Sequence, residues 1–268
     1  GGRCDGSAHA GCQADCVFFW KEAWLKRADD SPAPTLLASG AGCTAQRVQA
    51  AAKIDDDPTN PTWVCQTTVI YEASDPLERW DVRQYLADVT SGNHSLWHMV
   101  KLLSRSAYAK LLNIGVGYGI LLKFYNSWQK LRGGAPFPTI EGRIRKGQPT
   151  PNEILDLAPG EWVEVKSSEE IAATITLAGF NRGMRYDTEM LKYSGNRYRV
   201  QQRVDQLIDE KSGKMVRMKS PCIQLEDVFC RAEFTPDRLG CPRASNTYWR
   251  EIWLKRVAES QPERLEQH

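Results

Sequence analysis

Cysteine is the residue type in this chain with the clearest chemistry. The 268 residues include eight cysteines, which gather towards the two ends of the chain, with none between Cys65 and Cys222. Eight thiols are enough for four disulfides, although a chain of this length does not need disulfides to fold. They are also enough for two sets of four thiolates, the donor set of many zinc ions and iron–sulfur clusters, so the sequence predicts one or two metal centres. The candidate thiol ligands are Cys4, Cys12, Cys16, Cys43, Cys65, Cys222, Cys230 and Cys241.

The first three cysteines, Cys4, Cys12 and Cys16, are spaced C-x7-C-x3-C and enclose His9. Cys12 and Cys16 are about one helical turn apart, so a helix would place both thiols on one face. We expect Cys12 near the start of a helix, where the helix dipole favours the thiolate. His9 lies among these thiols and is a candidate ligand or proton donor. Inert buried thiols and disulfides are the alternatives.

Cys222, Cys230 and Cys241 form a second group, spaced C-x7-C-x10-C. Three thiols leave a tetrathiolate site one ligand short, and a cysteine from the N-terminal region would complete it. Cys43 and Cys65 are candidates for a second site, and the spacing does not decide how the cysteines divide. The scattered ligands lack the C-x-x-C knuckle that zinc sites commonly use, so iron–sulfur clusters of the 4Fe–4S type are favoured over zinc.

Two segments near opposite ends of the chain match without a gap. Residues 12–27 read CQADCVFFWKEAWLKR, and residues 241–256 read CPRASNTYWREIWLKR. In both, two tryptophans four residues apart precede Leu-Lys-Arg, which predicts two amphipathic helices with cations at their C-terminal ends. We therefore expect a pseudo-symmetric pair that brings Cys12 and Cys241 to one site. Chance similarity, or two similar core helices, is the alternative.

The elements that must position these cysteines indicate an α+β fold. Residues 1–132 are expected to be a helical, cysteine-bearing region, and residues 133–149, rich in Gly, Pro and basic side chains, a linker. Residues 150–257 are expected to form a small SH3-like β-barrel that ends in a tryptophan-bearing helix, followed by a polar tail at 258–268. The two ends of the chain would then meet at the metal site.

Local patterns predict the individual elements. Helices are expected at 44–53, 80–89 and 96–131, the last interrupted by glycines, and a strand at 63–71. In the second half, strands are expected at 161–166, 198–208, 214–218 and 222–229, with a capped helical turn at 167–170 and a hairpin loop at 209–213.

The segments NRGMRYD at 181–187 and YWREIWL at 248–254, together with the opening CDG and HAGCQ, carry a family resemblance. The chain resembles a family of cysteine-rich bacterial proteins that share the C-terminal YWREIWL motif. The resemblance covers most of the chain and implies a bacterial protein, but it brings no activity with it. The functional interpretation therefore rests on the residues themselves.

Arg182 and Arg185 lie in the polar NRGMRYD segment between predicted β elements. Guanidinium groups and backbone amides in such a loop can converge on an anion, so both residues are candidates for binding an anionic cofactor or substrate. A solvated turn is the alternative. The 35 basic and 33 acidic residues of the chain nearly balance, so overall charge does not favour nucleic acid as a partner.

Residues 96–131 are apolar on one side and basic on the other. Such a segment could lie on a membrane surface or receive a protein partner, and a pair of core-facing helices is the alternative. No apolar run approaches the roughly 20 residues that are needed to span a bilayer. We therefore expect a cytoplasmic protein.

The sequence contains no Ser-His-Asp arrangement, P-loop or HExxH motif. The leading hypothesis is a soluble bacterial iron–sulfur protein with a redox or biosynthetic role. If it is an enzyme, we expect an iron–sulfur-dependent oxidoreductase that works with a protein partner or in an electron-transfer complex. The alternative is a zinc-stabilised module that binds nucleic acid or a protein partner.

Overall fold

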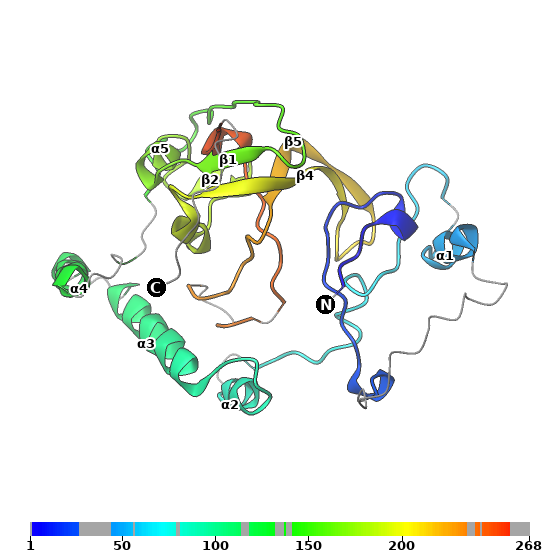
Figure 1. The fold of residues 1–268 in the computed structure, drawn as a ribbon, viewed down its shortest axis with the longest axis horizontal. Coiled ribbons are helices and arrows are strands. Elements are labelled where there is room, and N and C mark those ends of the chain that lie inside the picture. The colour runs from blue at the N-terminus through cyan, green and yellow to red at the C-terminus, as the bar shows by residue number, and fades with distance from the viewer. Residues whose placement is uncertain are drawn as a thin grey trace. The chain divides into compact units, whose positions relative to one another are not determined.

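The structure is a computed structural model that describes most of the chain, and it divides into two compact units (Figure 1). Unit 1 comprises Gly1–Pro76 and Val204–Pro221, and unit 2 comprises Leu77–Arg203 and Cys222–His268. The predicted linker at 133–149 falls within unit 2. Helices and antiparallel strands are both present, which confirms the α+β character. The described residues are 2–26, 44–55, 57–78, 81–113, 118–131, 137, 141–234, 239–241 and 243–257.

Where the structure describes it, unit 1 consists of loops, three short helical elements and the strand segments of residues 204–208 and 215–221. The helical elements are the 3₁₀ turns η1 (Ser7–His9) and η2 (Glu22–Trp24) and the helix α1 (Ala45–Ala51). The helix predicted at 44–53 is confirmed, and Thr44 caps it by accepting a hydrogen bond from the Arg47 amide at 3.3 Å. The small core of this unit consists of Ala52, Trp63 and Ile208, with Cys12 and Met215 packed against it.

The strand predicted at 63–71 is wrong. Of residues 63–71 only Trp63 forms a β-bridge, with Lys53, and the chain then continues through turns. Thr68 Oγ1 accepts a hydrogen bond from the Cys65 amide at 2.9 Å, and the Val69 amide donates to the Cys65 carbonyl at 3.2 Å. These local bonds close the backbone into a turn and outweigh the β-propensity of the sequence.

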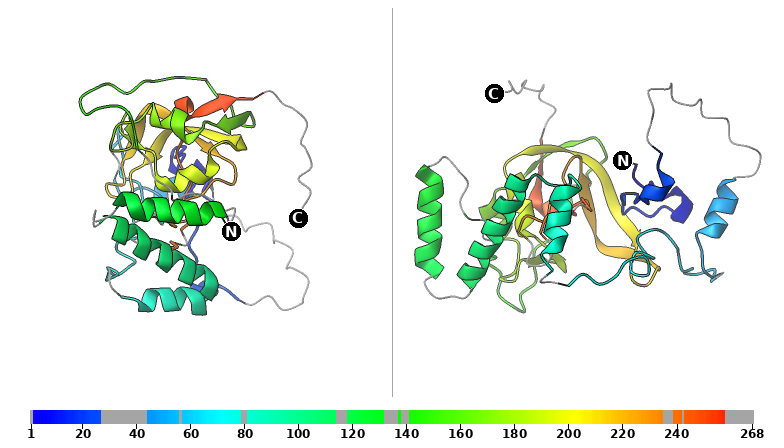
Figure 2. Two further views of the ribbon diagram at one scale, coloured as in Figure 1. Left: turned by 90° about the vertical axis from the view of Figure 1, so that its left-hand side faces the viewer. Right: turned by 90° about the horizontal axis from the view of Figure 1, so that it is seen from below.

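Unit 2 begins with helices. The helices α2 (Arg83–Thr90), α3 (Leu96–Asn113) and α4 (Tyr118–Leu131) follow one another, and α3 packs against both others (Figure 2). The helices predicted at 80–89 and 96–131 are confirmed where the structure describes them, as α2, α3 and α4. Trp80 and residues 114–117, with two of the three predicted interrupting glycines, lie outside the described residues, and the third, Gly119, lies within α4. Among the helices of the described ranges, none is long and apolar enough to cross a bilayer.

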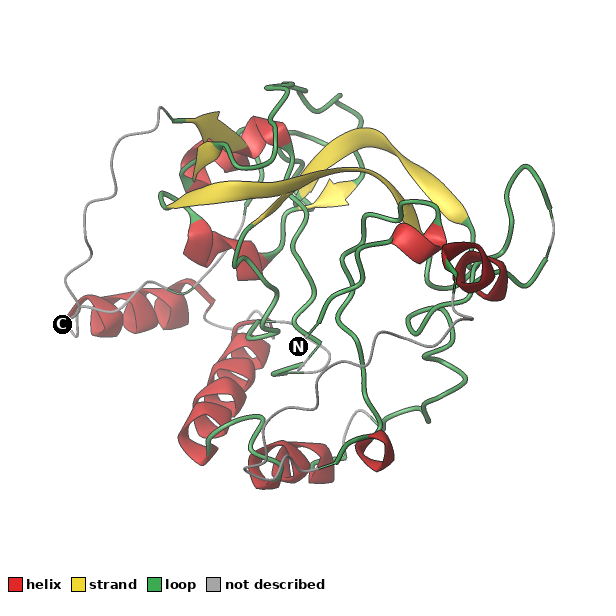
Figure 3. Ribbon diagram, turned by 45° about the vertical axis from the view of Figure 1, so that its right-hand side comes forward, coloured by secondary structure: helices red, strands yellow, loops and turns green. Residues whose placement is uncertain are grey.

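The main sheet has the strand order β5-β4-β1-β6. Its strands are β1 (Trp162–Val165), β4 (Arg197–Ile208), β5 (Met215–Leu225) and β6 (Leu254–Arg256), and the long β4 and β5 curve along their length (Figure 3). β1 pairs antiparallel with both β4 and β6. The strand predicted at 214–218 and the first part of that predicted at 222–229 form the single strand β5, and Pro221 is tolerated within it because β5 is at the edge of the sheet. The rest of the predicted strand is wrong, because the chain turns at residues 226–227, where Asp227 has a φ of +59°.

Shorter elements complete unit 2. The predicted capped turn at 167–170 is confirmed as α5 (Ser168–Ala172), with a reciprocal capping box between Ser167 and Glu170. The strands β2 (Phe180–Asn181) and β3 (Met184–Arg185) form a hairpin. The remaining elements are the 3₁₀ helices η3 (Thr188–Tyr193) and η4 (Glu251–Trp253).

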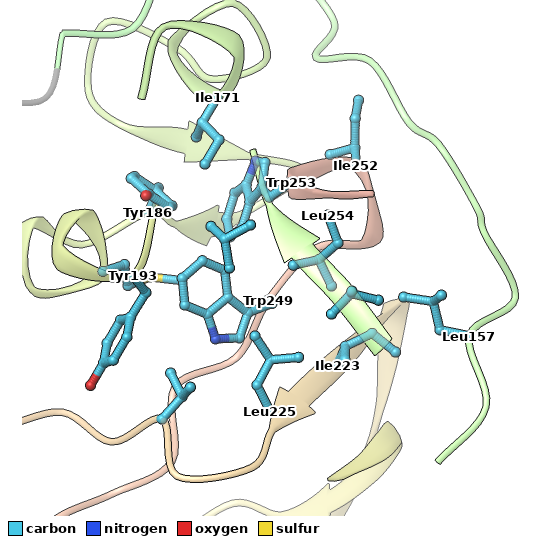
Figure 4. Packing of buried hydrophobic residues seen from close by; sticks show 14 of the residues in the cluster. Leu157, Ile171, Tyr186, Tyr193, Ile223, Leu225, Trp249, Ile252, Trp253 and Leu254 are labelled. Carbon is cyan, nitrogen blue, oxygen red and sulfur yellow. The ribbon is translucent and has the colours of Figure 1, made fainter. Parts of the chain in front are cut away.

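Two tryptophans form the centre of the unit 2 core. Trp249 and Trp253 are fully buried, and Tyr186 packs edge-on against both, with ring centroids 6.2 and 5.1 Å away (Figure 4). Aromatic side chains of this size dominate the energetics of a core. Aliphatic side chains from β1, α5 and β5 surround them, among them Val163, Ile171, Ile223 and Leu225.

The prediction that both copies of the repeat form tryptophan-bearing helices is wrong. Each copy forms a single 3₁₀ turn at Glu-x-Trp, and the next residue is extended. The residue before the turn has φ/ψ of −71/137° at Lys21 and −77/140° at Arg250, so residues 21–25 and 250–254 share one backbone conformation. In the C-terminal copy the chain does not continue as a helix after the turn, because Leu254 begins the strand β6, which pairs with β1.

The two copies differ in burial. Trp249 and Trp253 are fully buried, whereas their counterparts Trp20 and Trp24 are 63% and 61% exposed. The same local sequence therefore produces the same turn in both places, and the surroundings decide whether the tryptophans are covered.

Candidate functional site

The N-terminal cysteines gather in unit 1. The Cys4 amide donates to the Cys16 carbonyl at 2.9 Å, which closes the loop that contains Cys12. The sulfurs of Cys65 and Cys16 lie 3.0 and 4.0 Å from one hydroxyl oxygen, Thr67 Oγ1. The structure thus brings Cys65 to the N-terminal thiols across about fifty residues of sequence, a proximity that spacing alone did not predict.

His9 is held in one orientation beside Cys4. Its Nε2 lies 3.1 Å from the Val64 carbonyl oxygen, and its Nδ1 lies 4.0 Å from Cys4 Sγ. Since a carbonyl only accepts, Nε2 carries the proton in a neutral ring and Nδ1 presents its lone pair to the thiol. The edge-to-face contact with Trp63, at 6.1 Å between ring centroids, supports the ring from another side.

Cys12 does not lie at the start of a helix, so that prediction is wrong. It follows the 3₁₀ turn η1, and its sulfur accepts a hydrogen bond from the Ile208 amide at 3.3 Å. Gly6 makes this fold of the loop possible: its φ is +73°, and a Cβ there would lie 1.9 Å from the Cys12 carbonyl oxygen. An amide donor, rather than a helix dipole, therefore faces this thiol.

Burial keeps two of the thiols protonated. It raises the pKa of Cys4 and raises the pKa of Cys16 to about 11, and the charges of neighbouring Cys12 and Cys65 act in the same direction. A raised pKa does not suit a nucleophilic Cys4–His9 pair, which needs a thiolate near neutral pH. A bound cation would reverse this effect, because it stabilises thiolates that repel one another.

Among the residues that the structure describes, no group of three or more His, Cys, Asp or Glu side chains is arranged to hold a metal ion. Cys43 lies outside those residues. Of the predicted metal ligands, Cys4, His9, Cys12, Cys16 and Cys65 share unit 1.

The C-terminal cysteines lie in unit 2. Cys222 is fully buried, and its sulfur accepts a hydrogen bond from Arg250 Nη1 at 3.4 Å. Burial raises the pKa of Cys230, and the charges of Glu189, Asp187 and Cys241 act in the same direction. Since Cys12 and Cys241 belong to different units, their joining at one site stays a prediction.

Arg182 and Arg185 lie in the hairpin of β2 and β3. Arg182 and Gly183 have φ of +44° and +82°, which is typical of the tight two-residue turn that joins such strands. Both arginine side chains are exposed, and the Arg182 carbonyl accepts a hydrogen bond from Arg250 Nη2 at 3.0 Å. The turn is thereby anchored to the buried Arg250, and the binding of an anion by the two arginines stays a prediction.

Unit 2 also contains a pocket of about 360 Å³. The sequence did not predict it, because its walls come from three separate segments without a common motif. A Cβ at Gly142 would lie 2.0 Å from the Thr176 carbonyl oxygen, so glycine allows two backbones to meet at this wall. Its lining comprises Glu141, Gly142, Arg143, Ser168, Glu169, Ile171, Ala172, Ile175, Tyr186 and Leu191.

Tyr186 should ionise only in strong alkali. Burial raises its pKa from the ordinary 10.0 to about 12, partly offset by a hydrogen bond with Ser194 Oγ at 3.2 Å. Because the folded state holds this proton more tightly, the contribution to stability is complete below pH 10 and is lost as the pH rises through about 12. Absorbance titration of the phenolate, with Tyr186→Phe as reference, checks this. A component near pH 10 that disappears in the variant would contradict it.

Comparison with known proteins places no constraint on this geometry. No protein-family model matches the chain, and neither does any curated protein.

Proposed function

We propose that the thiols of unit 1 form a metal centre that binds an iron–sulfur cluster. The observation that carries the proposal is the meeting of Cys16 and Cys65 at Thr67 Oγ1, at 4.0 and 3.0 Å, close to the Cys4–His9 pair. Cys12 supplies a fourth thiol from the same loop. Four thiolates from scattered positions are a donor set suited to a 4Fe–4S cluster.

The surroundings of the thiols support this function. Cluster potentials depend on hydrogen bonds to sulfur and on solvent exposure. Here the Ile208 amide donates to Cys12 Sγ at 3.3 Å, and the four thiols are half-buried rather than exposed. The protein would then have a redox or biosynthetic role in the cytoplasm, together with a protein or electron-transfer partner, and the curved sheet would be part of an SH3-like barrel.

A zinc-stabilised binding module is the second candidate, and His9 favours it. Histidines that bind zinc commonly donate their other ring N–H to a carbonyl group, and His9 makes such a bond to Val64 at 3.1 Å. Its Nδ1 would then be a ligand beside Cys4. A single zinc ion would fix the N-terminal loop to the segment around Cys65, because metal binding contributes to folding where it joins distant ligands.

Metal and sulfide analysis of the full chain tests these proposals. We expect protein purified without oxygen to contain iron and acid-labile sulfide, with absorption in the visible range that Cys65→Ser abolishes. One zinc ion per protein chain and no sulfide would rule out the iron–sulfur cluster and support the zinc-stabilised module. Protein that contains neither metal under these conditions would overturn both.

A matched variant shows which cysteines hold the metal. Cys230→Ser changes a half-buried thiol of unit 2 and should leave the metal content unchanged if unit 1 supplies the site alone. Loss of metal in both Cys65→Ser and Cys230→Ser would show instead that the two groups of cysteines share a centre. Retention in both variants would exclude a thiolate site that depends on Cys65.

A further inference from the structure

The helix α4 already has a packed face. The ring centroid of Tyr125 lies 5.1 Å from that of Tyr108 on α3, and Asn126 Oδ1 accepts a hydrogen bond from the Phe137 amide at 2.7 Å. The Tyr108 hydroxyl donates to the Leu121 carbonyl. The apolar side chains that pack α4 against the rest of unit 2 are therefore distinct from any other apolar surface on this helix.

Such a surface is present. Ile120, Phe124 and Leu131 are 77%, 69% and 83% exposed. Successive residues of a helix turn by about 100°, so these three side chains fall within an arc of about 40° and form one stripe. Large apolar side chains gathered in this way on a surface commonly mark a site of interaction with a protein or a membrane.

The charged side chains of α4 itself have one sign. Lys123 and Lys130 are exposed and lie about 20° apart around the helix, next to the stripe. The whole segment 96–131 contains five Lys or Arg residues and no Asp or Glu. An anionic surface would complement this charge, whereas an acidic residue near the stripe would have opposed it.

The preceding helix adds apolar side chains of the same kind. Leu96 and Trp97 at the start of α3 are 67% and 78% exposed. Trp suits the boundary between lipid headgroups and acyl chains, because its ring is apolar and its N–H is polar. A helix of the length of α4 spans about 21 Å, which fits a helix lying in the plane of the interface rather than across it.

We propose that α4 binds the surface of a membrane that contains anionic lipids. Ile120, Phe124 and Leu131 would enter the boundary of the acyl chains, and Lys123 and Lys130 would contact lipid phosphates. The surface belongs to unit 2 and uses none of the thiols of unit 1, so this inference does not depend on the proposed metal centre.

Vesicle binding by the full chain tests the inference. We expect co-sedimentation with vesicles of phosphatidylcholine and phosphatidylglycerol at about 7:3 to exceed that with pure phosphatidylcholine about tenfold, and to fall with added salt. Phe124→Ser with Leu131→Ser should reduce the partition coefficient at least about tenfold. Lys123→Glu with Lys130→Glu should remove the preference for anionic vesicles.

Ile154→Ser is the matched control. Ile154 is 62% exposed in unit 2 but outside α3 and α4, so its replacement should not change binding. Equal binding of both vesicle types, or an equal loss in the Ile154 variant, would overturn the proposal. So would failure to bind vesicles combined with self-association that Phe124→Ser and Leu131→Ser abolish, because the stripe would then be a protein interface.

Discussion

Trp253→Ala should destabilise unit 2 by about 3 to 5 kcal/mol, the range measured when a buried aromatic side chain is cut back to alanine. The indole is fully buried, packs against Tyr186 at 5.1 Å between ring centroids, and donates from Nε1 to Thr174 Oγ1 at 3.1 Å. Removal of the indole leaves a cavity and also leaves the Thr174 hydroxyl without its hydrogen-bond donor. Denaturant unfolding, together with hydrogen exchange of the β1 amides, measures the loss.

The internal repeat supplies a control at the equivalent position. Trp24 occupies the same place in the same 3₁₀ turn, but it is 61% exposed. Trp24→Ala should therefore change the free energy of unfolding by no more than about 0.5 kcal/mol. A similarly large loss of unfolding free energy in both variants would show that Trp24 is also buried in the folded protein. It would contradict the difference in burial between the two copies.

Glu251→Ala should have the second large effect, about 3 kcal/mol. The buried carboxylate accepts hydrogen bonds from the amides of Leu155 at 2.6 Å, Asp156 at 3.3 Å and Leu157 at 3.5 Å. It also accepts one from Arg203 Nη1 at 2.7 Å. Its removal leaves several partly buried donors without this acceptor, which costs more than the net gain of an ordinary hydrogen bond.

Glutamine and the other copy of the repeat separate charge from shape. Glu251→Gln keeps the size and one acceptor oxygen, so we expect a smaller loss than for alanine. Glu22 is the equivalent residue of the N-terminal copy and is exposed, so Glu22→Ala should fall within about 0.5 kcal/mol of the unchanged protein. Equal stability of the Glu251→Ala variant would mean that other acceptors replace the carboxylate for residues 155–157.

Elements that depend on local chemistry were predictable. The helix that Thr44 caps, the capping box of α5 and the alternating strands of the β4–β5 hairpin follow from bonds and side-chain patterns within a few residues of one another. The repeat was also visible in the sequence, and its two copies do share a conformation. The helical spacing of the tryptophans nevertheless led to a wrong prediction of helices, because tryptophans four residues apart also fit a turn followed by a strand.

The sequence by itself indicated that Cys4, Cys12 and Cys16 lie near one another and that the described parts of residues 96–131 form amphipathic helices with basic side chains. Only the tertiary structure decided which cysteines share a unit, since Cys65 reaches Cys16 through a turn that strand propensity did not predict. Only the tertiary structure, likewise, buried Trp249 and Trp253 and left Trp20 and Trp24 exposed. The physical reason is that backbone conformation follows from near neighbours, whereas burial and the meeting of ligands depend on surfaces contributed by distant segments.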